Sequence, residues 1–361
     1  MMLLSHPRLV VRVSCVKGIV NNRLAARTCA YMLNVQVGTC GRNGKTGPNE
    51  SLGKYWSPRY WHTWAGLGVM WLIHLLPARA QRACGRILGA LVRNLPFSYV
   101  RIARRNLALC FPDLSAADRE ELLKRHFASI GMGVCETANT WWASDEEIES
   151  VTEVVGREHI ATALAAGRGV IMVGAHFTTI EIATRILGTL APLNVLYRPT
   201  KNKLLAQFLL NNTARHARRA IPYDAIRTLV SALRANEVVW YAPDQSYRNK
   251  GAAMVPFFGI PAASTTATSR LAKMSGAKVL TYLPERLPSG RYRVTISPPL
   301  DNYPSVDPVA DVVRFHALIE AHIRRIPEQY LWIHRRFKGL DADYPHYYGR
   351  DQRIRAPRPS A

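Results

Sequence analysis

The sequence is poor in acidic residues, and this shortage is its most informative compositional feature. Of 361 residues, 48 are Lys or Arg and only 25 are Asp or Glu, which gives a formal net charge of +23. Such a surface favours polyanionic partners, namely nucleic acid, anionic lipid headgroups, phosphorylated substrates or an acidic carrier protein. Apolar residues still make up 48% of the chain. This content excludes a disordered protein and allows one large α/β domain or two smaller ones.

Cysteine pairs and metal-binding motifs are also lacking. No C-x-x-C pair occurs, and no histidine stands at zinc spacing from any of the six cysteines, which are Cys15, Cys29, Cys40, Cys84, Cys110 and Cys135. This pattern predicts unpaired thiols in a reducing compartment, and it indicates neither a zinc nor an iron–sulfur site. The chain also has no G-x-S-x-G elbow and no Cys–His signature, so nothing in it indicates an acyl-enzyme.

Residues 1–54 differ from the rest of the chain. They hold eight Lys or Arg residues but a single acid, Glu50, and their last part is rich in Gly and Asn. A targeting peptide would share the shortage of acids, but it would also need a continuous apolar core that ends in a small-residue cleavage site. We therefore predict a poorly ordered N-terminal extension, and we expect activity to survive its removal.

An apolar run follows at residues 61–77, without any Asp, Glu, Lys or Arg. Its length is near the lower limit for crossing a bilayer, its tryptophans suit a membrane interface, and the chain turns strongly basic after it. We predict a membrane-anchor helix within residues 55–80, either transmembrane or deep in the interface, with a buried core helix as the alternative. The downstream arginines indicate that the catalytic domain, residues 81–340, lies on the cytoplasmic side of the cell inner membrane. Residues 341–361 are predicted to form an irregular C-terminal tail.

Short apolar runs alternate with helical patterns through the catalytic domain. Strands are predicted at residues 169–174, 193–197, 238–242, 278–284 and 292–297, and helices at 116–130, 204–218, 225–233, 265–274 and 308–325. The first of these strands is apolar throughout, as expected for a strand buried on both faces. The alternation predicts an α/β fold with a single largely parallel mixed sheet flanked by helices.

The most promising chemistry lies directly after the first of these strands, in the segment His176-Phe177-Thr178-Thr179-Ile180-Glu181. Ligand sites in open α/β sheets gather at the carboxyl ends of strands, where His176 is expected. If His176 lies in the turn before a helix, Glu181 can reach it and hold one imidazole nitrogen, which leaves the other nitrogen to take a proton from a hydroxyl. Taken alone, this spacing is a weak signal, and a structural histidine with a satisfied hydrogen bond explains it better.

Further motifs before and after this segment decide between these alternatives. They are PRYW at 58–61, RRNLALCFP at 104–112, YRP at 197–199, EVVWYAPDQ at 237–245, TTATSRLAKMSGA at 265–277 and PEQYLWIHRRFK at 327–338. From Ser57 to about Tyr348 the chain resembles the late acyltransferases of lipid A biosynthesis, specifically the lauroyl-transferring type. These enzymes belong to the wider H-x4-D/E acyltransferases that act on glycerolipids. Residues 1–54 have no counterpart in this resemblance.

The resemblance implies a reaction and its partners. An acyl chain, laurate in this branch, passes from an acyl carrier protein thioester to a hydroxyl of a 3-hydroxyacyl chain on Kdo2-lipid IVA, a precursor of lipid A in lipopolysaccharide biosynthesis. His176 is then the general base, and Glu181 orients and charge-balances it. Transfer is direct and requires no metal or other cofactor. A palmitoleoyl or myristoyl variant of the same family remains an alternative.

Other residues are candidates for substrate binding. Arg198 suits a phosphate of the carrier or the lipid, and Asp244 could position substrate or pair with Arg198. His334, Arg335 and Arg336 lie in a basic block that suits contact with the lipid headgroup. The structural alternative for Arg198 is a surface cation, and that for Asp244 is a turn residue after Pro243. The structural alternative for the basic block is a solvated basic face.

Two other functions are compatible with parts of the sequence. A glycerol-phosphate or lysophospholipid acyltransferase would share the His176–Glu181 spacing, but the block at 327–338 speaks against it. A basic nucleic-acid-binding protein would share the charge, but the positive residues are spread widely and no nucleic-acid-binding motif is visible. We therefore expect an anionic membrane surface, and not nucleic acid, as the polyanionic partner.

Overall fold

A computed structural model describes residues 50–197 and 200–349 of the chain. Most of the predicted extension therefore lies outside the described residues. Its last part, residues 50–54, belongs to the fold, because it leads into a short 3-10 helix, η1 (Leu52–Tyr55), whose Tyr55 is buried. The side chain of Asn211 also donates a hydrogen bond of 2.9 Å to the carbonyl of Glu50. These contacts join residues 50–54 to the rest of the described fold.

The main sheet has seven strands, and its strand order places two non-consecutive strands side by side at the centre. The order is β1 (Thr152–Val155), β9 (Tyr292–Ile296), β8 (Lys278–Arg286), β2 (Val170–Val173), β5 (Val238–Tyr241), β3 (Leu193–Tyr197) and β4 (Arg219–Pro222). Every neighbouring pair is parallel except β8 and β9, so the predicted largely parallel mixed sheet is confirmed. A separate hairpin is formed by β6 (Ala252–Phe257) and β7 (Ile260–Thr265).

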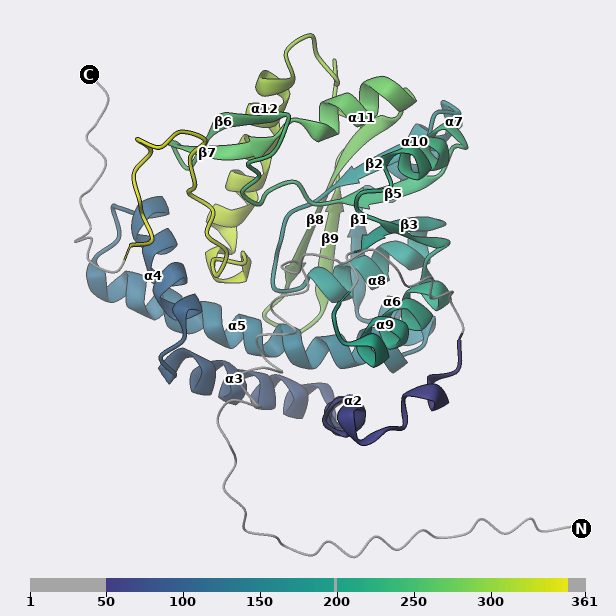
Figure 1. The fold of residues 1–361 in the computed structure, drawn as a ribbon, viewed down its shortest axis with the longest axis vertical. Coiled ribbons are helices and arrows are strands. Elements are labelled where there is room, and N and C mark those ends of the chain that lie inside the picture. Colours follow the sequence, from purple (N-terminus) through teal and green to yellow (C-terminus); the bar gives the residue numbers. More distant parts are fainter. Residues whose placement is uncertain (1–49, 198–199, 350–361) are drawn as a thin grey trace, which may run out of the picture. The chain divides into compact units, whose positions relative to one another are not determined.

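Helices flank this sheet, as Figure 1 shows. In chain order they are η2 (Pro58–Tyr60), α2 (Trp61–His74), α3 (Ala78–Asn94), α4 (Ser98–Cys110), α5 (Ala116–Trp142), α6 (Asp145–Ser150), α7 (Glu158–Ala165), α8 (Ile180–Leu190), α9 (Lys203–His216), α10 (Ile226–Arg234), α11 (Ala267–Ser275), α12 (Pro308–Arg325) and η3 (Pro327–Gln329). The longest helix, α5, begins where expected because the hydroxyl of Ser115 caps it by accepting a hydrogen bond from the backbone of Asp118.

Strand β2 is buried along its whole length, because its four residues, Val170 to Val173, are all apolar and lie between helices. The hydrophobic core beside it joins residues of β2, β8 and β9 to residues of α7 and α8. Burial of both faces is typical of a central parallel strand. Strand β2 therefore forms a rigid support for the residues that follow it.

Glycines allow α5 to pack unusually closely on both of its sides. A Cβ at Gly89 of α3 would lie 2.0 Å from the carbonyl oxygen of Phe127, and one at Gly131 would lie 1.9 Å from that of Gly85. On the other side, a Cβ at Gly133 would lie 2.2 Å from the carbonyl oxygen of Thr178. No side chain fits in such gaps, so α5 is held between α3 and the loop after β2.

The predicted membrane anchor at residues 55–80 is divided into η2, α2 and the start of α3. Among the helices of residues 50–197 and 200–349, none combines the length and the apolar character needed to cross a membrane. The transmembrane form of the prediction is therefore not confirmed. Helix α2 ends at His74, shortly before Pro77, which disfavours helical backbone in the residue before it.

The cysteines that the structure describes carry free thiols, which agrees with the prediction. Cys84 is exposed, whereas Cys110 and Cys135 are buried. Burial raises the pKa of Cys135 to about 11 and raises that of Cys110 well above its ordinary value. Both buried thiols therefore stay protonated and unreactive at neutral pH.

Two buried histidines predict that acid destabilises the fold. Burial lowers the pKa of His126 to about 4, and burial together with the charge of Arg336 lowers the pKa of His316 to about 4. The unfolded chain binds more protons than the folded chain between these values and the ordinary pKa of about 6.5. Stability should therefore fall as the pH drops from about 6.5 to about 4, by about 1.4 kcal/mol per pH unit for each histidine. Thermal unfolding across this range measures the slope.

The His126→Gln protein should show a shallower acid slope, since glutamine does not titrate. His346 is exposed, so the His346→Gln protein serves as the matched control and should keep the parental slope. Equal slopes for the His126→Gln and parental proteins would contradict the prediction.

Candidate active site

The pairing of β2 with β5 brings His176 and Asp244 together. In this parallel pair Val173 lies opposite Tyr241. His176 and Asp244 each stand three residues beyond these partners, and the backbone of Gly174 still donates a 2.9 Å hydrogen bond to the carbonyl of Tyr241. The two side chains therefore meet at the carboxyl edge of the sheet, although 68 residues separate them along the chain.

Two contacts join these residues. The Nδ1 atom of His176 lies 2.5 Å from Oδ1 of Asp244, and the backbone N–H of His176 donates a 3.0 Å hydrogen bond to Oδ2. Both residues are buried, with 4% and 0% of their surface exposed. Burial alone would raise the pKa of Asp244, but the charge of His176 and the hydrogen bonds from His176 and Tyr330 outweigh it and lower the pKa to about 2. The carboxylate therefore remains ionised at neutral pH, next to the imidazole.

Residues 329–331 hold the pair from the opposite side. The hydroxyl of Tyr330 donates a 3.0 Å hydrogen bond to Oδ2 of Asp244, and the backbone of Leu331 donates one of 2.8 Å to the carbonyl of His176. The backbone of Thr178 in turn donates a 2.7 Å hydrogen bond to the carbonyl of Gln329. Oδ2 thus has two donors, which leaves Oδ1 directed at the imidazole. No sequence signal singled out Tyr330 beyond its place in the block at 327–338.

A buried ion pair between Arg286 and Glu136 supports the loop that follows β2. Nη2 of Arg286 donates a 2.6 Å hydrogen bond to Glu136 of α5, and its Nη1 donates one of 2.8 Å to the hydroxyl of Ser129. That hydroxyl is 2.7 Å from the hydroxyl of Thr178. All these side chains are buried, so the network fixes the loop relative to α5. The sequence analysis did not predict this network. The signal that could have indicated it is Glu136, an acidic residue within the apolar part of α5.

Glu181 occupies a different position from the one expected. It lies in the first turn of α8, where a negative charge is favourable. The carboxylate that holds Nδ1 of His176 is that of Asp244, not that of Glu181. The Glu181 residue keeps contact with solvent, although the surrounding protein is dense enough that desolvation raises the pKa of its carboxyl. A second carboxylate thus stands near the start of α8, separate from the histidine–aspartate pair.

The other predicted substrate-binding residues differ in their surroundings. The half-buried His334 accepts a 3.2 Å hydrogen bond at Nε2 from the backbone of Ser246. Burial and the charge of nearby His176 lower the pKa of His334 to about 3, so its imidazole is neutral beside the pair. Arg335 is exposed. Arg198 lies outside the described residues.

Arg336 does not fit the predicted role of headgroup contact. Its guanidinium is buried and donates hydrogen bonds of 3.1 Å to the carbonyl of Ala263 and 2.7 Å to the hydroxyl of Ser264. It also lies over the ring of Phe257, 4.9 Å from the centroid. These internal contacts join the chain after η3 to β7, so Arg336 stabilises the fold.

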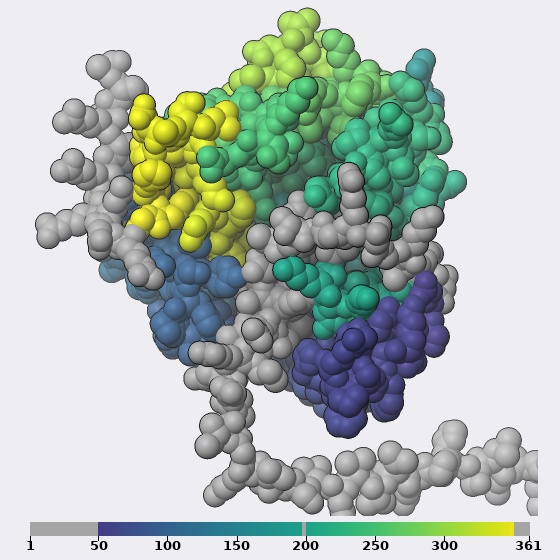
Figure 2. Space-filling view, in the orientation of Figure 1, coloured from purple at the N-terminus to yellow at the C-terminus, as the bar shows by residue number. Residues whose placement is uncertain are grey.

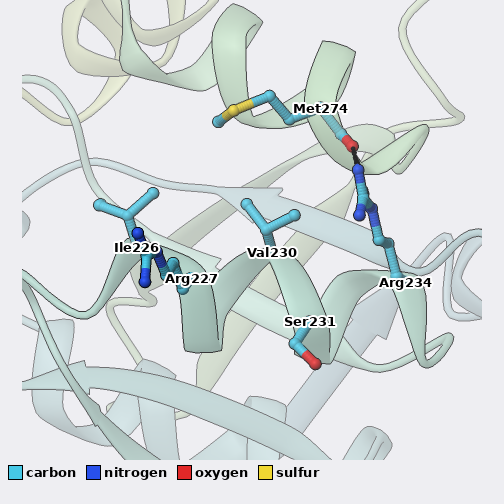
Figure 3. A pocket seen from close by; sticks show the side chains of 6 residues that line it. All are labelled: Ile226, Arg227, Val230, Ser231, Arg234 and Met274. Carbon is cyan, nitrogen blue, oxygen red and sulfur yellow. Dashed lines mark hydrogen bonds between the residues drawn. The ribbon is translucent and has the colours of Figure 1, made fainter.

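A surface pocket of about 350 Å³ lies between α10 and α11, away from the pair. Figure 3 shows its lining residues, with Arg234 donating a hydrogen bond to the carbonyl of Met274. The chain runs from the ends of α10 and α11 into the amino ends of β5 and β8, whereas His176 and Asp244 follow the carboxyl ends of their strands. This pocket therefore belongs to the opposite edge of the sheet.

The arrangement at the carboxyl edge can move a proton. An imidazole with an ionised carboxylate on Nδ1 has a fixed tautomer, and its Nε2 atom can accept a proton while the carboxylate stabilises the resulting cation. Within residues 50–197 and 200–349, no group of three or more His, Cys, Asp or Glu side chains is placed to hold a metal ion. A histidine–carboxylate pair at the carboxyl end of a strand is an arrangement that can serve general acid–base chemistry.

The chain belongs to the bacterial lipid A biosynthesis acyltransferases, whose family pattern matches residues 50–339. It is 38% identical over 293 residues to the lipid A biosynthesis lauroyltransferase of Escherichia coli K12, which covers 81% of this chain and 96% of that protein. It is also 38% identical to the palmitoleoyltransferase of the same organism, over 78% of this chain and 92% of that protein. The E. coli lipid A biosynthesis myristoyltransferase is 27% identical over 76% of this chain and 86% of that protein. Family membership confirms an acyltransferase and decides against the alternative of a nucleic-acid-binding protein.

Proposed function

We propose that this acyltransferase moves a fatty acyl chain, laurate in the first instance, from acyl carrier protein to a hydroxyl of a 3-hydroxyacyl chain on Kdo2-lipid IVA. The observation that carries the proposal is the His176–Asp244 pair at the carboxyl edge of β2 and β5, inside the segment that matches the family. A hydroxyl acceptor needs a base, and this pair supplies one in a buried site. The acyl thioester is already activated, so the remaining requirement is correct positioning.

The proposed step is a direct transfer. Nε2 of His176 takes the proton of the acceptor hydroxyl while its oxygen bonds to the thioester carbonyl carbon. The carbon–sulfur bond then breaks, and the carrier leaves as a thiol after taking that proton from Nε2 of His176. Asp244 stabilises the transient imidazolium through Nδ1, where the distance is 2.5 Å. No covalent acyl-enzyme is required in this scheme.

Glu181 and His334 have proposed roles beside the pair. Glu181 remains a catalytic residue in the proposal, as a carboxylate in the first turn of α8 that contacts the acceptor or influences the charge of His176. His334 is neutral and lies close enough to His176 for their charges to interact, so it can contact substrate next to the reacting atoms. Arg335 is exposed, and its proposed role remains contact with the lipid headgroup. The proposed role of Arg198 remains contact with a phosphate of the carrier or the lipid.

The choice of acyl chain is tested by mass spectrometry. The full-length protein is incubated with Kdo2-lipid IVA and a panel of acyl carrier protein thioesters, and the molecular mass of the lipid product is measured. Addition of one lauroyl group is the expected result. Equal similarity to a lauroyltransferase and a palmitoleoyltransferase makes palmitoleate the second candidate, and both stand above myristate. The absence of any acylated product with every thioester would contradict the proposed reaction.

We further propose that the enzyme works at the cytoplasmic face of the cell inner membrane and is held there by its N-terminal part. The acceptor is a lipid, so a bacterial enzyme of this family is membrane-associated. The basic residues that follow the apolar run favour the cytoplasmic leaflet, whose lipids are anionic. Cell fractionation, with protease added to inverted or right-side-out vesicles, tests this orientation.

Tyr330 should affect the chemical step more than substrate binding. The Tyr330→Phe protein loses the hydrogen bond that keeps Oδ2 of Asp244 occupied, so the carboxylate can rotate away from Nδ1. We expect kcat to fall about tenfold with KM nearly unchanged, since one hydrogen bond to a charged group is worth about 1.5–3 kcal/mol. Steady-state kinetics with the acyl carrier thioester measures both constants.

The Tyr282→Phe protein is a matched control for this prediction. Tyr282 is equally buried and donates a 2.7 Å hydrogen bond to the backbone of Ala183, away from Asp244. Its loss should lower stability without a tenfold loss of kcat. If both variants lose kcat equally, Tyr330 has no particular role in positioning Asp244.

A further inference from the structure

Two surface segments meet against β7, beside the active site. The first, residues 245–250, follows β5, and the second, residues 334–338, follows η3. The backbone of Tyr247 donates a 3.1 Å hydrogen bond to the carbonyl of Ala263, whose own N–H donates one of 2.9 Å to the carbonyl of Lys338. Both segments are therefore held by the same residue of β7. Figure 2 shows the C-terminal segment, in yellow, at the surface beside the green part of the chain that includes β6 and β7.

Three positively charged side chains come together where these segments meet. Arg248 and Arg335 are exposed, and Lys338 is half-buried. Partial burial lowers the pKa of Lys338, and the charges of Arg335 and Arg248 lower it further. Both arginines therefore lie within electrostatic range of the lysine. We call these three residues the cation cluster.

The cation cluster has no acidic partner within residues 50–197 and 200–349. None of its three side chains forms an ion pair or donates a hydrogen bond there. The neighbouring Arg336 differs, because its buried guanidinium donates hydrogen bonds to the carbonyl of Ala263 and the hydroxyl of Ser264. Like charges without a counter-ion repel one another, so an anion that binds among these cations gains their combined attraction.

The backbone that carries Arg335 is fixed near the catalytic pair. The carbonyl of His334 accepts a 2.7 Å hydrogen bond from the side chain of Asn106, in addition to the contact at its Nε2 atom described above. The charges of His176 and of Lys338 both act on His334, so this imidazole lies within range of the catalytic histidine and of the cluster. The cation cluster is therefore preorganised close to the reacting atoms.

Among the anions of the proposed reaction, a phosphate of the lipid fits the cation cluster best. Arginine binds phosphate oxygens through two-point contacts, and lysine adds a point charge. The pantetheine phosphate of the carrier is a diester with a single negative charge, whereas a phosphate monoester carries about −1.5 to −2 at pH 7. Three cations match the monoester better.

The position of the reacting hydroxyl also favours the lipid. This hydroxyl is on the third carbon of an acyl chain whose first carbon is joined to the headgroup. The headgroup must therefore lie close to His176 during transfer, as the cluster does. The pantetheine arm, in contrast, holds the phosphate of the carrier away from its thioester.

We propose that Arg248, Arg335 and Lys338 bind one phosphate of the lipid acceptor and thereby hold its 3-hydroxyacyl chain at His176. This inference rests on the proposed function for the identity of the acceptor. It adds the chemical group that is recognised and two side chains, Arg248 and Lys338, that recognise it together with Arg335. The cluster then determines the affinity for the lipid and not that for the acyl carrier protein.

Steady-state kinetics with both substrates tests this assignment. The full-length Arg248→Ala, Arg335→Ala, Lys338→Ala protein is assayed with the acceptor in detergent micelles. Its KM for Kdo2-lipid IVA should rise about tenfold or more, whereas its KM for the acyl carrier thioester should stay within about twofold. Added salt should raise the lipid KM of the parental protein more than that of the variant. The Arg248→Ala, Arg335→Ala protein changes exposed side chains only and should shift the same constant if the triple variant does not fold.

Removal of phosphate from the acceptor shows whether the cluster contacts that group. Phosphatase-treated Kdo2-lipid IVA should have a KM about tenfold higher than the untreated lipid with the parental protein. The increase should be clearly smaller with the triple variant, because the contact is already absent there. An equal increase with both proteins would mean that other residues bind the phosphate, and it would overturn the proposal.

The Arg168→Ala, Arg227→Ala, Lys273→Ala protein is the matched control. It also removes two arginines and one lysine, but these exposed side chains line the surface pockets at the opposite edge of the sheet. Both KM values should stay parental. A rise in the lipid KM equal to that of the cluster variant would reveal a general effect of net charge and overturn the proposal. A cluster variant in which only the KM for the acyl carrier thioester rises would also overturn it, in favour of the carrier.

Binding without transfer separates this inference from the proposed function. Equilibrium binding of radiolabelled Kdo2-lipid IVA in micelles is measured without any thioester. The parental protein should bind the lipid about tenfold or more tightly than the triple variant. If it does so but no thioester supports transfer, the phosphate site stands and the proposed function is refuted. If transfer occurs but both proteins bind the lipid equally, the proposed function stands and the phosphate site is overturned.

Discussion

The His176→Ala protein is expected to transfer acyl chains about 10³-fold more slowly than the parental protein. His176 is the imidazole at the carboxyl edge of the central strands, with an ionised carboxylate 2.5 Å from its Nδ1 atom. General-base assistance supplies about 10²–10⁴ in rate, and no other described histidine combines this position with such a partner. The measurement is the initial rate of product formation from an acyl carrier thioester and Kdo2-lipid IVA at saturating concentrations.

The loss must come from chemistry and not from unfolding. Removal of His176 leaves Asp244 with the hydroxyl of Tyr330 and the backbone N–H of residue 176 as donors, so the buried carboxylate is still partly satisfied. The variant should therefore unfold cooperatively and float with vesicles. A His346→Ala protein, which changes an exposed histidine, should keep full activity. A rate within tenfold of the parental one in a folded His176→Ala protein would refute the general-base role.

The position of His176 could be predicted from the sequence because local signals determine it. The apolar run of β2 predicts a buried strand, and Gly174 ends it, so the next residues must stand at the edge of the sheet. The same reasoning correctly placed β3, β5, β8 and α12, whose periodicity and flanking residues are clear. Local sequence patterns were sufficient to predict an element wherever its position does not depend on contacts with neighbouring elements.

The carboxylate partner could not be predicted in this way. Glu181 is five residues from His176 and is the natural choice from local spacing, whereas Asp244 is 68 residues away. The contact with Asp244 depends on the strand order, in which β5 lies directly beside β2, and on a register that matches Val173 with Tyr241. Neither the strand order nor the register of a parallel sheet can be predicted from the sequence of a single strand.

Helix α5 shows a second limit of local reasoning. The predicted helix ended at Ile130, and the residues that follow include Gly131 and Gly133, a residue type that weakens helices. The helix continues to Trp142, and the two glycines are needed where α3 and the Thr178 carbonyl approach its backbone. Tertiary contact outweighed local propensity at these positions, and the contact itself is invisible without the fold.

Comparison of Asp244→Asn with Glu181→Gln distinguishes the two carboxylates. Asn keeps the shape of Asp244 but removes its charge, and an amide NH₂ group turned toward Nδ1 would place the histidine proton on Nε2. We expect kcat to fall by about 10²–10⁴, because His176 then loses both its correct tautomer and its stabilising charge. The Glu181→Gln protein also loses activity if its carboxylate assists, and initial rates of both variants across a range of pH measure the difference.

The dependence on pH differs between the two carboxylates because their pKa values move in opposite directions. Asp244 has a pKa of about 2 and stays ionised, so the deficit of Asp244→Asn should be constant over the assay range. Desolvation raises the pKa of Glu181, so the parental Glu181 becomes neutral as the pH falls and then resembles glutamine. The deficit of Glu181→Gln should therefore shrink toward acid pH. If instead the Glu181→Gln deficit is constant and Asp244→Asn is nearly fully active, Glu181 is the carboxylate that serves His176 during transfer, and the contact with Asp244 is structural.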